Sequence, residues 1–104
     1  MIYLATSLFT VAEREFGFSL TERIEKLGYK VYYPWRDAGD EELIKRFGSD
    51  MSQVNDEIVR RNLEAIRNCE QFIAVAEGSD VESGTSMELG FAHALGKRIR
   101  CLRT

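Results

Sequence analysis

Glu88 occupies a position at which the pattern of the last predicted helix predicts an apolar residue. At about 100° per residue, Phe91, Ala92 and Leu95 all fall within about 60° of Glu88 on the helix surface. We therefore expect Glu88 in the middle of the apolar face, pointing towards a sheet, and in the first turn, where the helix dipole stabilises an anion. A half-buried carboxylate at such a junction suits nucleophilic or acid–base chemistry.

The same glutamate also has a purely structural interpretation. Thr85 and Glu88 have the spacing of a capping box, in which the glutamate side chain only bonds back to the N-cap residue. The acidic loop at residues 77–85 brings further carboxylates beside Glu88, and solvated loop acids are common. Spacing alone leaves the catalytic and the structural interpretation open.

A second polar residue interrupts an apolar stripe in the preceding helix. Asn62 falls between Ile58 and Ile66, and a buried amide needs hydrogen-bond partners, either from a neighbouring loop or from a ligand. Aromatic residues also gather after the first two predicted strands. Most are expected in the core, and one or two are candidates for stacking on a flat ligand. They are Phe9, Tyr32, Tyr33 and Trp35.

Several common kinds of site do not match the pattern. The turn at residues 5–9 contains no glycine, so the dinucleotide fingerprint is absent, and no Gly-Lys-Ser/Thr loop occurs. His93 is the only histidine, and Cys69 and Cys101 have no close partner of ligand type, so we predict no metal site. Both cysteines occupy positions that suggest the core. No cofactor is expected.

Composition places the chain among single globular domains. It has 104 residues, of which 44% are hydrophobic and 30% charged, with a net charge of −3. The absence of a basic stripe argues against a nucleic-acid partner. No apolar run is longer than residues 72–76, so no membrane span is expected, and nothing resembles a signal peptide. We predict a soluble, cytoplasmic domain.

Apolar strand patterns alternate with helical patterns along the whole chain. Strands are predicted at residues 2–5, 31–33, 72–76 and 98–102. Helical patterns occupy residues 10–28, 41–47, 52–68 and 85–95. This order predicts an α/β fold, a flavodoxin- or Rossmann-like parallel sheet of four strands with helices on both faces. Ligands of such sheets bind beyond the carboxyl ends of the strands, here residues 6–10, 34–40 and 77–85.

The last helix carries a recognisable signature. Residues 83–92 read Ser-Gly-Thr-Ser-Met-Glu-Leu-Gly-Phe-Ala, and Ala-Leu-Gly-Lys follows at 94–97. This segment resembles the signature of the nucleoside 2-deoxyribosyltransferase family, and three further segments agree in order and spacing. They are residues 2–10, 33–37 and 62–69. The resemblance covers essentially the whole chain and implies one domain over residues 1–104.

The resemblance implies a mechanism. The glutamate that matches Glu88 is the family's nucleophile, which attacks C1′ of a 2′-deoxynucleoside and forms a deoxyribosyl-enzyme ester that a second nucleobase resolves. The tyrosine that matches Tyr3 positions the nucleophile, and Phe9 matches an aromatic residue in the base-stacking loop. Two acidic family positions, used for base binding and proton transfer, fall on Asn62 and Glu82. The expected partners are thus small molecules, a deoxynucleoside and a nucleobase, within nucleoside salvage.

The remaining residues assigned to the substrate follow from the same resemblance. They are Ser7, Arg36, Asp37, Gly84 and Thr85.

The chain departs from the family pattern in three places. Glu82 stands where Asp is usual, and Asn62 replaces an Asp, so it can hydrogen-bond a base but cannot shuttle a proton. Family members continue for several tens of residues beyond the position of Thr104, with a fifth strand and a helix, so we expect a domain without that extension. In the family a group from this tail reaches a neighbouring subunit and holds the 5′-hydroxyl of the substrate sugar there. The resemblance therefore implies a homo-oligomer, either a dimer or a hexamer.

Two other functions remain open. Relatives that hydrolyse 2′-deoxynucleoside 5′-monophosphates place Gly and Arg in the loop after the first strand, and residues 6–9 contain neither, although Arg36 remains available for a phosphate contact. A non-catalytic nucleoside-binding module is the other alternative, suggested by the changes at Glu82 and Asn62 and by the missing tail.

Overall fold

The computed structural model describes residues 1–48 and 50–104, which contain four strands and five helices. In chain order these are β1 (Ile2–Ala5), α1 (Val11–Lys26), β2 (Val31–Tyr32), α2 (Pro34–Asp37), α3 (Asp40–Phe47), α4 (Met51–Asn68), β3 (Gln71–Val75), α5 (Ser83–Ala94) and β4 (Arg98–Leu102). All strand pairs are parallel and the sheet order is β2-β1-β3-β4. The predicted α/β fold with a four-stranded parallel sheet is confirmed.

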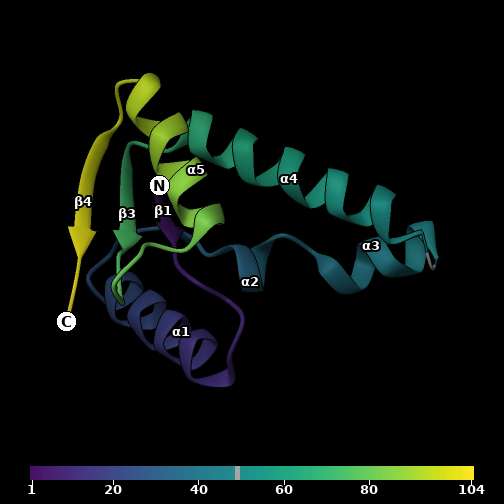
Figure 1. Cartoon of the computed structure of the whole chain (residues 1–104), viewed down its shortest axis with the longest axis horizontal. Helices are drawn as coiled ribbons and strands as arrows, with labels where there is room; N and C mark the ends of the chain where they lie inside the picture. The colour runs from purple at the N-terminus through teal and green to yellow at the C-terminus, as the bar shows by residue number, and fades with distance from the viewer. Residues whose placement is uncertain (49) are drawn as a thin grey trace.

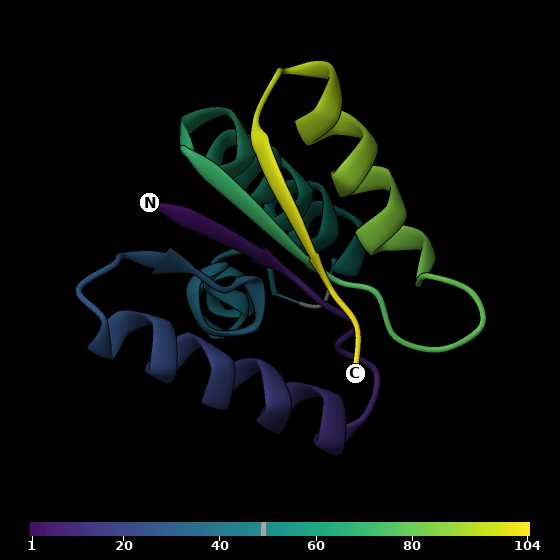
Figure 2. The ribbon, with the colours of Figure 1, turned by 90° about the vertical axis from the view of Figure 1, so that its left-hand side faces the viewer.

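The helices form a layer on each side of the sheet. Figure 2 shows α1 below the strands and α4 and α5 above them. Each layer has its own apolar cluster: Leu4 and Val31 pack towards Leu20 and Ile24 of α1, whereas Phe72 packs in the cluster beneath α4 and α5. β1 is therefore a central strand that sends alternate side chains into the two clusters.

The first helix begins where the sequence predicted. The Thr10 side chain accepts from the Glu13 backbone N–H, and the Glu13 side chain accepts from Thr10, so the capping box is complete. Gly17 then lies directly against the buried Tyr33 ring, where no side chain would fit. Thr21, also buried, donates its hydroxyl to the Gly17 carbonyl.

The segment after β2 differs from the expected loop because it contains the short helix α2. Pro34 occupies the first helical position, for which its fixed φ and missing N–H are suited, and it ends the pairing of β2. Asp37 accepts from the Tyr33 backbone N–H and secures this turn. Beyond it, α3 and the first half of α4 project past the sheet (Figure 1), held together by the buried Leu43 and Val54.

The edge strand β4 has a solvent-exposed side. Arg98 and Arg100 are exposed. Cys101 is exposed too, so its predicted core position is wrong, whereas Cys69 is buried. The reason is that Cys101 lies on an edge strand whose outer positions α5 leaves uncovered. In the part of the chain described here, no helix is both long and apolar enough to cross a membrane.

The contact between α1 and the Tyr33 ring generates a stability prediction. In Gly17→Ala the new Cβ would lie 2.3 Å from the Tyr33 Oη. We expect net destabilisation of about 1–3 kcal/mol from overpacking, despite the better helix propensity of alanine. Gly90→Ala in α5 is the matched control, because nothing lies within 4 Å of its Cβ. It should stabilise the fold by up to about 1 kcal/mol. Urea unfolding measures both, and a Gly17→Ala variant as stable as the wild type would contradict the packing described.

Candidate active site

A hydrogen bond joins the centre of the sheet to the last helix. The Tyr3 hydroxyl, on β1, donates to Oε2 of Glu88, on α5, over 2.5 Å. The prediction that Glu88 points towards the sheet is therefore confirmed. A tyrosine and a carboxylate 85 positions apart in the sequence form one unit.

The Tyr3 ring has little freedom to move. It is fully buried and stacks between two aromatic rings, with centroid distances of 5.4 Å to Tyr32 and 5.3 Å to Phe72. Neighbouring strands β2 and β3 supply these rings in register with Tyr3. The stack aims the hydroxyl at α5 and fixes where the Glu88 carboxylate can lie.

The surroundings of Glu88 change its ionisation. Burial raises the pKa of Glu88, the hydrogen bond from Tyr3 opposes that rise, and the negative charge of Glu82 adds to it, so that the pKa is about 7. The same burial and the neighbouring carboxylate raise the pKa of Tyr3 well above its usual range, so the phenol keeps its proton. Glu88 is thus a carboxyl group that gains and loses its proton near neutral pH.

The start of α5 differs from both interpretations of the sequence. The helix begins at Ser83 and its N-cap is Glu82, so Thr85 is a buried residue inside the first turn and not the cap. The capping box between Thr85 and Glu88 does not form. Glu88 lies in the second turn, so the prediction that it lies in the first turn, where the helix dipole stabilises an anion, is also wrong.

Glu82, and not Glu88, caps the N-terminus of α5. Its two carboxylate oxygens accept from the Gly84 N–H at 2.8 Å and the Thr85 N–H at 2.9 Å, and Thr85 adds its hydroxyl at 3.2 Å. Burial pushes the pKa of Glu82 upward, but these hydrogen bonds together outweigh it and hold the pKa below its usual value. A Cβ on Gly84 would lie 3.1 Å from Oε2 of Glu82, so a side chain here would require the carboxylate to shift by a few tenths of an ångström.

A cavity of about 370 Å³ opens at the carboxyl ends of β1 and β3. This is the point where the strand order reverses, the usual ligand position in such sheets. Ser7 and Thr6 line it from the first loop, and the side chains that line it include no lysine or arginine in the part of the chain described. Its acidic lining consists of Glu13, Glu77, Asp80 and Glu82. Glu82 connects this cavity electrostatically to Glu88, which does not line it.

Asn62 has a partner within the protein. Its Oδ1 accepts from the Tyr32 hydroxyl at 2.9 Å, so the amide is held by a strand residue and not by the neighbouring loop that the sequence suggested. Since Tyr32 stacks on Tyr3, the contacts run from Asn62 through two tyrosines to Glu88.

The structure separates two predicted substrate residues from this cluster. The Arg36 guanidinium bonds to Glu25, to Asp37 and to the Val31 carbonyl, and Asp37 also accepts from the Tyr33 N–H. Arg36 therefore has its donors engaged in holding α2 against α1 and β2. Ion pairs with Glu25 and Asp37 thus already occupy the guanidinium that the sequence left available for a phosphate contact.

One residue that sequence reasoning missed fastens the first loop. Arg14 donates from Nε to the Leu8 carbonyl at 2.8 Å and from Nη2 to the Phe9 carbonyl at 3.3 Å, and its Cζ lies 4.3 Å from the Trp35 ring centroid. Ser7, in the same loop, helps to lower the pKa of Glu13. An arginine in an ordinary polar stretch of helix gives no sequence signal for such contacts.

The described residues contain no group of three or more His, Cys, Asp or Glu side chains that could hold a metal ion.

Comparisons with known proteins bear on the family and the fold. A family model described as Nucleoside 2-deoxyribosyltransferase matches residues 2–104. A solved structure of a 2-deoxyribosyltransferase from Bacillus psychrosaccharolyticus superposes with a TM-score of 0.80 at 23% identity, covering 98% of this chain and 71% of that one. A 2-desoxiribosyltransferase from Leishmania mexicana gives a TM-score of 0.72 at 21% identity, covering 99% of this chain and 63% of that one. At these identities the likeness shows a shared fold. A search of curated protein sequences finds no match.

The hydrogen bond from Tyr3 generates a prediction about ionisation. In Tyr3→Phe the donor that stabilises the Glu88 carboxylate is lost while burial remains, so the pKa of Glu88 should rise above its value of about 7. Carbon-13 NMR titration of the glutamate carboxyl groups measures this, with the Glu88 signal assigned from its absence in Glu88→Gln. Tyr29→Phe, at an exposed tyrosine, is the control and should cause no shift. An unchanged or lower pKa in Tyr3→Phe would show that Tyr3 does not stabilise the anion.

Proposed function

The chain belongs to the nucleoside 2-deoxyribosyltransferase family, and we propose that it transfers the 2-deoxyribosyl group of a 2′-deoxynucleoside from one nucleobase to another. The observation that carries this proposal is the hydrogen bond between Tyr3 and Glu88, because it joins the two residues that the resemblance assigns to the nucleophile and its positioning group. Glu88 is half-buried, on the side of α5 that faces the sheet.

The proposed reaction has two displacements. A Glu88 oxygen attacks C1′ as the bond from C1′ to the base nitrogen breaks, and the base leaves with the electron pair and takes up a proton. The product is a deoxyribosyl ester of Glu88. A nitrogen of the second base then attacks C1′, loses its proton, and releases the Glu88 carboxylate, so the sugar keeps its original configuration.

Tyr3 and Glu82 support these steps in different ways. Tyr3 holds Glu88 through the short hydrogen bond and stabilises the ionised form, which is the nucleophile. Glu82 is the proposed proton carrier. The N–H groups of Gly84 and Thr85 favour its ionised form, so it takes a proton from water when the nucleoside binds, gives that proton to the leaving base, and recovers one from the incoming base.

The charge of the cavity favours a substrate without phosphate. Carboxylates at Glu13, Glu77, Asp80 and Glu82 would repel a 5′-phosphate, and Arg36 is engaged elsewhere. Carboxylates and the Ser7 hydroxyl instead suit the hydroxyl groups of a sugar, since both accept hydrogen bonds. We therefore place the unphosphorylated 2′-deoxynucleoside ahead of the 5′-monophosphate.

Turnover assays test the proposal directly. Wild-type protein mixed with 2′-deoxyinosine and adenine should yield 2′-deoxyadenosine and hypoxanthine, measured by liquid chromatography, and should act less well on the 5′-monophosphate. Glu88→Gln should lose at least about a thousandfold in rate, because it removes the nucleophile while keeping the volume. Glu64→Gln, at an exposed glutamate of α4, is the matched control and should keep full activity.

The acceptor dependence separates the possible functions. Hypoxanthine released only in the presence of adenine indicates transfer, and release without adenine indicates hydrolysis. Neither product from any deoxynucleoside, with binding retained, would contradict the proposed catalysis and favour a binding module.

A further inference from the structure

Two exposed aromatic residues lie on segments that follow the carboxyl ends of β1 and β2. Phe9 is 75% exposed and Trp35 is 39% exposed, although both belong to short, well-fastened segments. Large apolar side chains left in solvent beside a ligand-binding edge are candidates for contact with a flat ligand. The resemblance already assigns base stacking to Phe9. It gives no role to Trp35.

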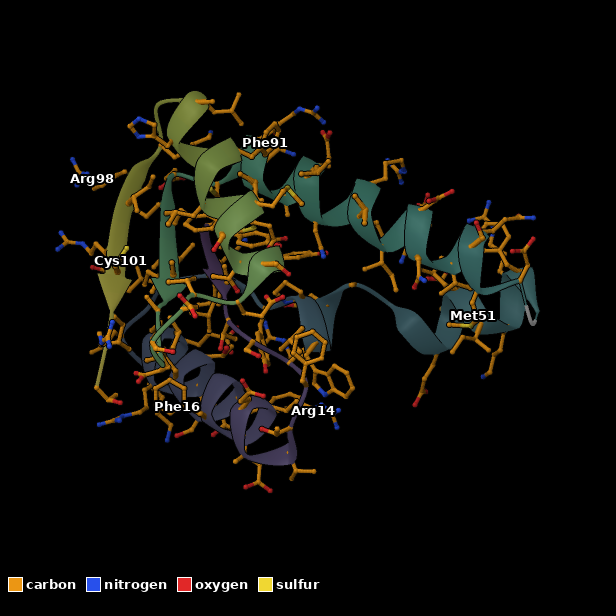
Figure 3. All side chains as sticks on the ribbon, in the orientation of Figure 1. Arg14, Phe16, Met51, Phe91, Arg98 and Cys101 are labelled. Carbon is orange, nitrogen blue, oxygen red and sulfur yellow. The ribbon has the colours of Figure 1, made fainter. Side chains whose placement is uncertain are left out.

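Arg14 connects the two aromatic segments. The N–H groups at the edge of its guanidinium donate to the carbonyls of Leu8 and Phe9. The face of the guanidinium lies over the Trp35 ring, with Cζ 4.3 Å from the ring centroid. Figure 3 shows Arg14 near the first turn of α1, on the side towards α2. A planar guanidinium can use its edge and its face at the same time, whereas a lysine ammonium cannot.

The backbone of α1 strengthens this connection. The Arg14 carbonyl accepts from the hydroxyl of the buried Tyr33, the residue directly before α2. The buried Tyr33 thus fixes the backbone of Arg14. From there its side chain reaches the loop at Leu8 and Phe9 on one side and Trp35 on the other. Without the Arg14 side chain, water would replace it as the hydrogen-bond donor to the carbonyls of Leu8 and Phe9. Trp35 would lose the guanidinium that lies over its ring.

We propose that Trp35 is a second stacking surface for the nucleobase, and that Arg14 is the positioning residue that holds Trp35 and the Phe9 loop in one arrangement. This inference rests on the proposed function for the identity of the ligand. The ligand class is a flat, neutral heterocycle, free or attached to deoxyribose, and aromatic stacking recognises it with little dependence on the particular base.

The chain supplies its own probe because Trp35 is its only tryptophan. Hypoxanthine and thymine, titrated into the full chain, should change the Trp35 emission in a saturable way after correction for absorbance. 2-Deoxyribose should not. In Arg14→Met the apparent Kd for hypoxanthine should weaken by about tenfold, a factor typical of losing one stacked contact. Arg14→Lys should weaken it similarly, since charge without the planar fork does not make all three contacts.

The matched control is Arg46→Met, at an exposed arginine whose Cζ lies 5.3 Å from the Phe47 ring, on the projecting α3. It should leave the Kd unchanged. In transfer assays Arg14→Met and Trp35→Ala should both raise KM for 2′-deoxyinosine about tenfold with kcat changed less than about threefold, because stacking binds ground state and transition state alike. Trp35→Ala removes an exposed ring and keeps the test available if Arg14→Met unfolds.

The outcomes separate this inference from the proposed function. An emission that does not respond to either base, or Trp35→Ala and Arg14→Lys variants with wild-type KM, would overturn the stacking role even where transfer proceeds. A saturable response that Arg14→Met and Arg14→Lys both weaken, in a protein that transfers no deoxyribose, would support the base subsite and reject the proposed reaction.

Discussion

The placement of a half-buried carboxylate beside the central strand is the constraint on which the rest of the site depends. Burial raises the pKa of Glu88, and the hydrogen bond from the Tyr3 hydroxyl works against this rise. That donor can act only because Tyr3 is stacked between rings of the two neighbouring strands and cannot turn away. The sheet order β2-β1-β3-β4 therefore has a chemical consequence: it surrounds Tyr3 with Tyr32 and Phe72 and sets α5 above it.

The segment at residues 82–88 performs two tasks that depend on each other. Glu82 fills the N-cap position, and Gly84 and Thr85 are the residues that let its carboxylate fold over the helix terminus. This leaves Glu88 without any capping role, so its side chain is free to meet Tyr3. The charge of Glu82 then raises the pKa of Glu88 further, which couples the cavity at the strand ends to the buried pair. The two carboxyl groups thus have opposite pKa shifts, upward at Glu88 and downward at Glu82.

Sequence reasoning predicted those features that depend on periodicity and failed where tertiary contacts choose between equivalent local patterns. The alternation of strands and helices, the start of the first helix and the direction of Glu88 all followed from spacing. The start of α5 did not, because Glu82 and Thr85 are both plausible caps and only the geometry of the loop decides between them. The ion pair between Arg36 and Glu25 could not be predicted, because only the fold brings the two side chains together. The role of Arg14 could not be predicted either, because its partners are backbone carbonyls and a ring on another helix.

The claim that the Tyr3–Glu88 pair is a nucleophilic centre is tested most directly by intact-protein mass spectrometry after brief mixing with 2′-deoxyinosine and acid quenching. The account predicts an adduct of one deoxyribosyl unit that peptide mapping places on Glu88, that a second nucleobase discharges, and that Glu88→Gln does not form. Turnover without any adduct on Glu88, or an adduct that persists in Glu88→Gln, would contradict it.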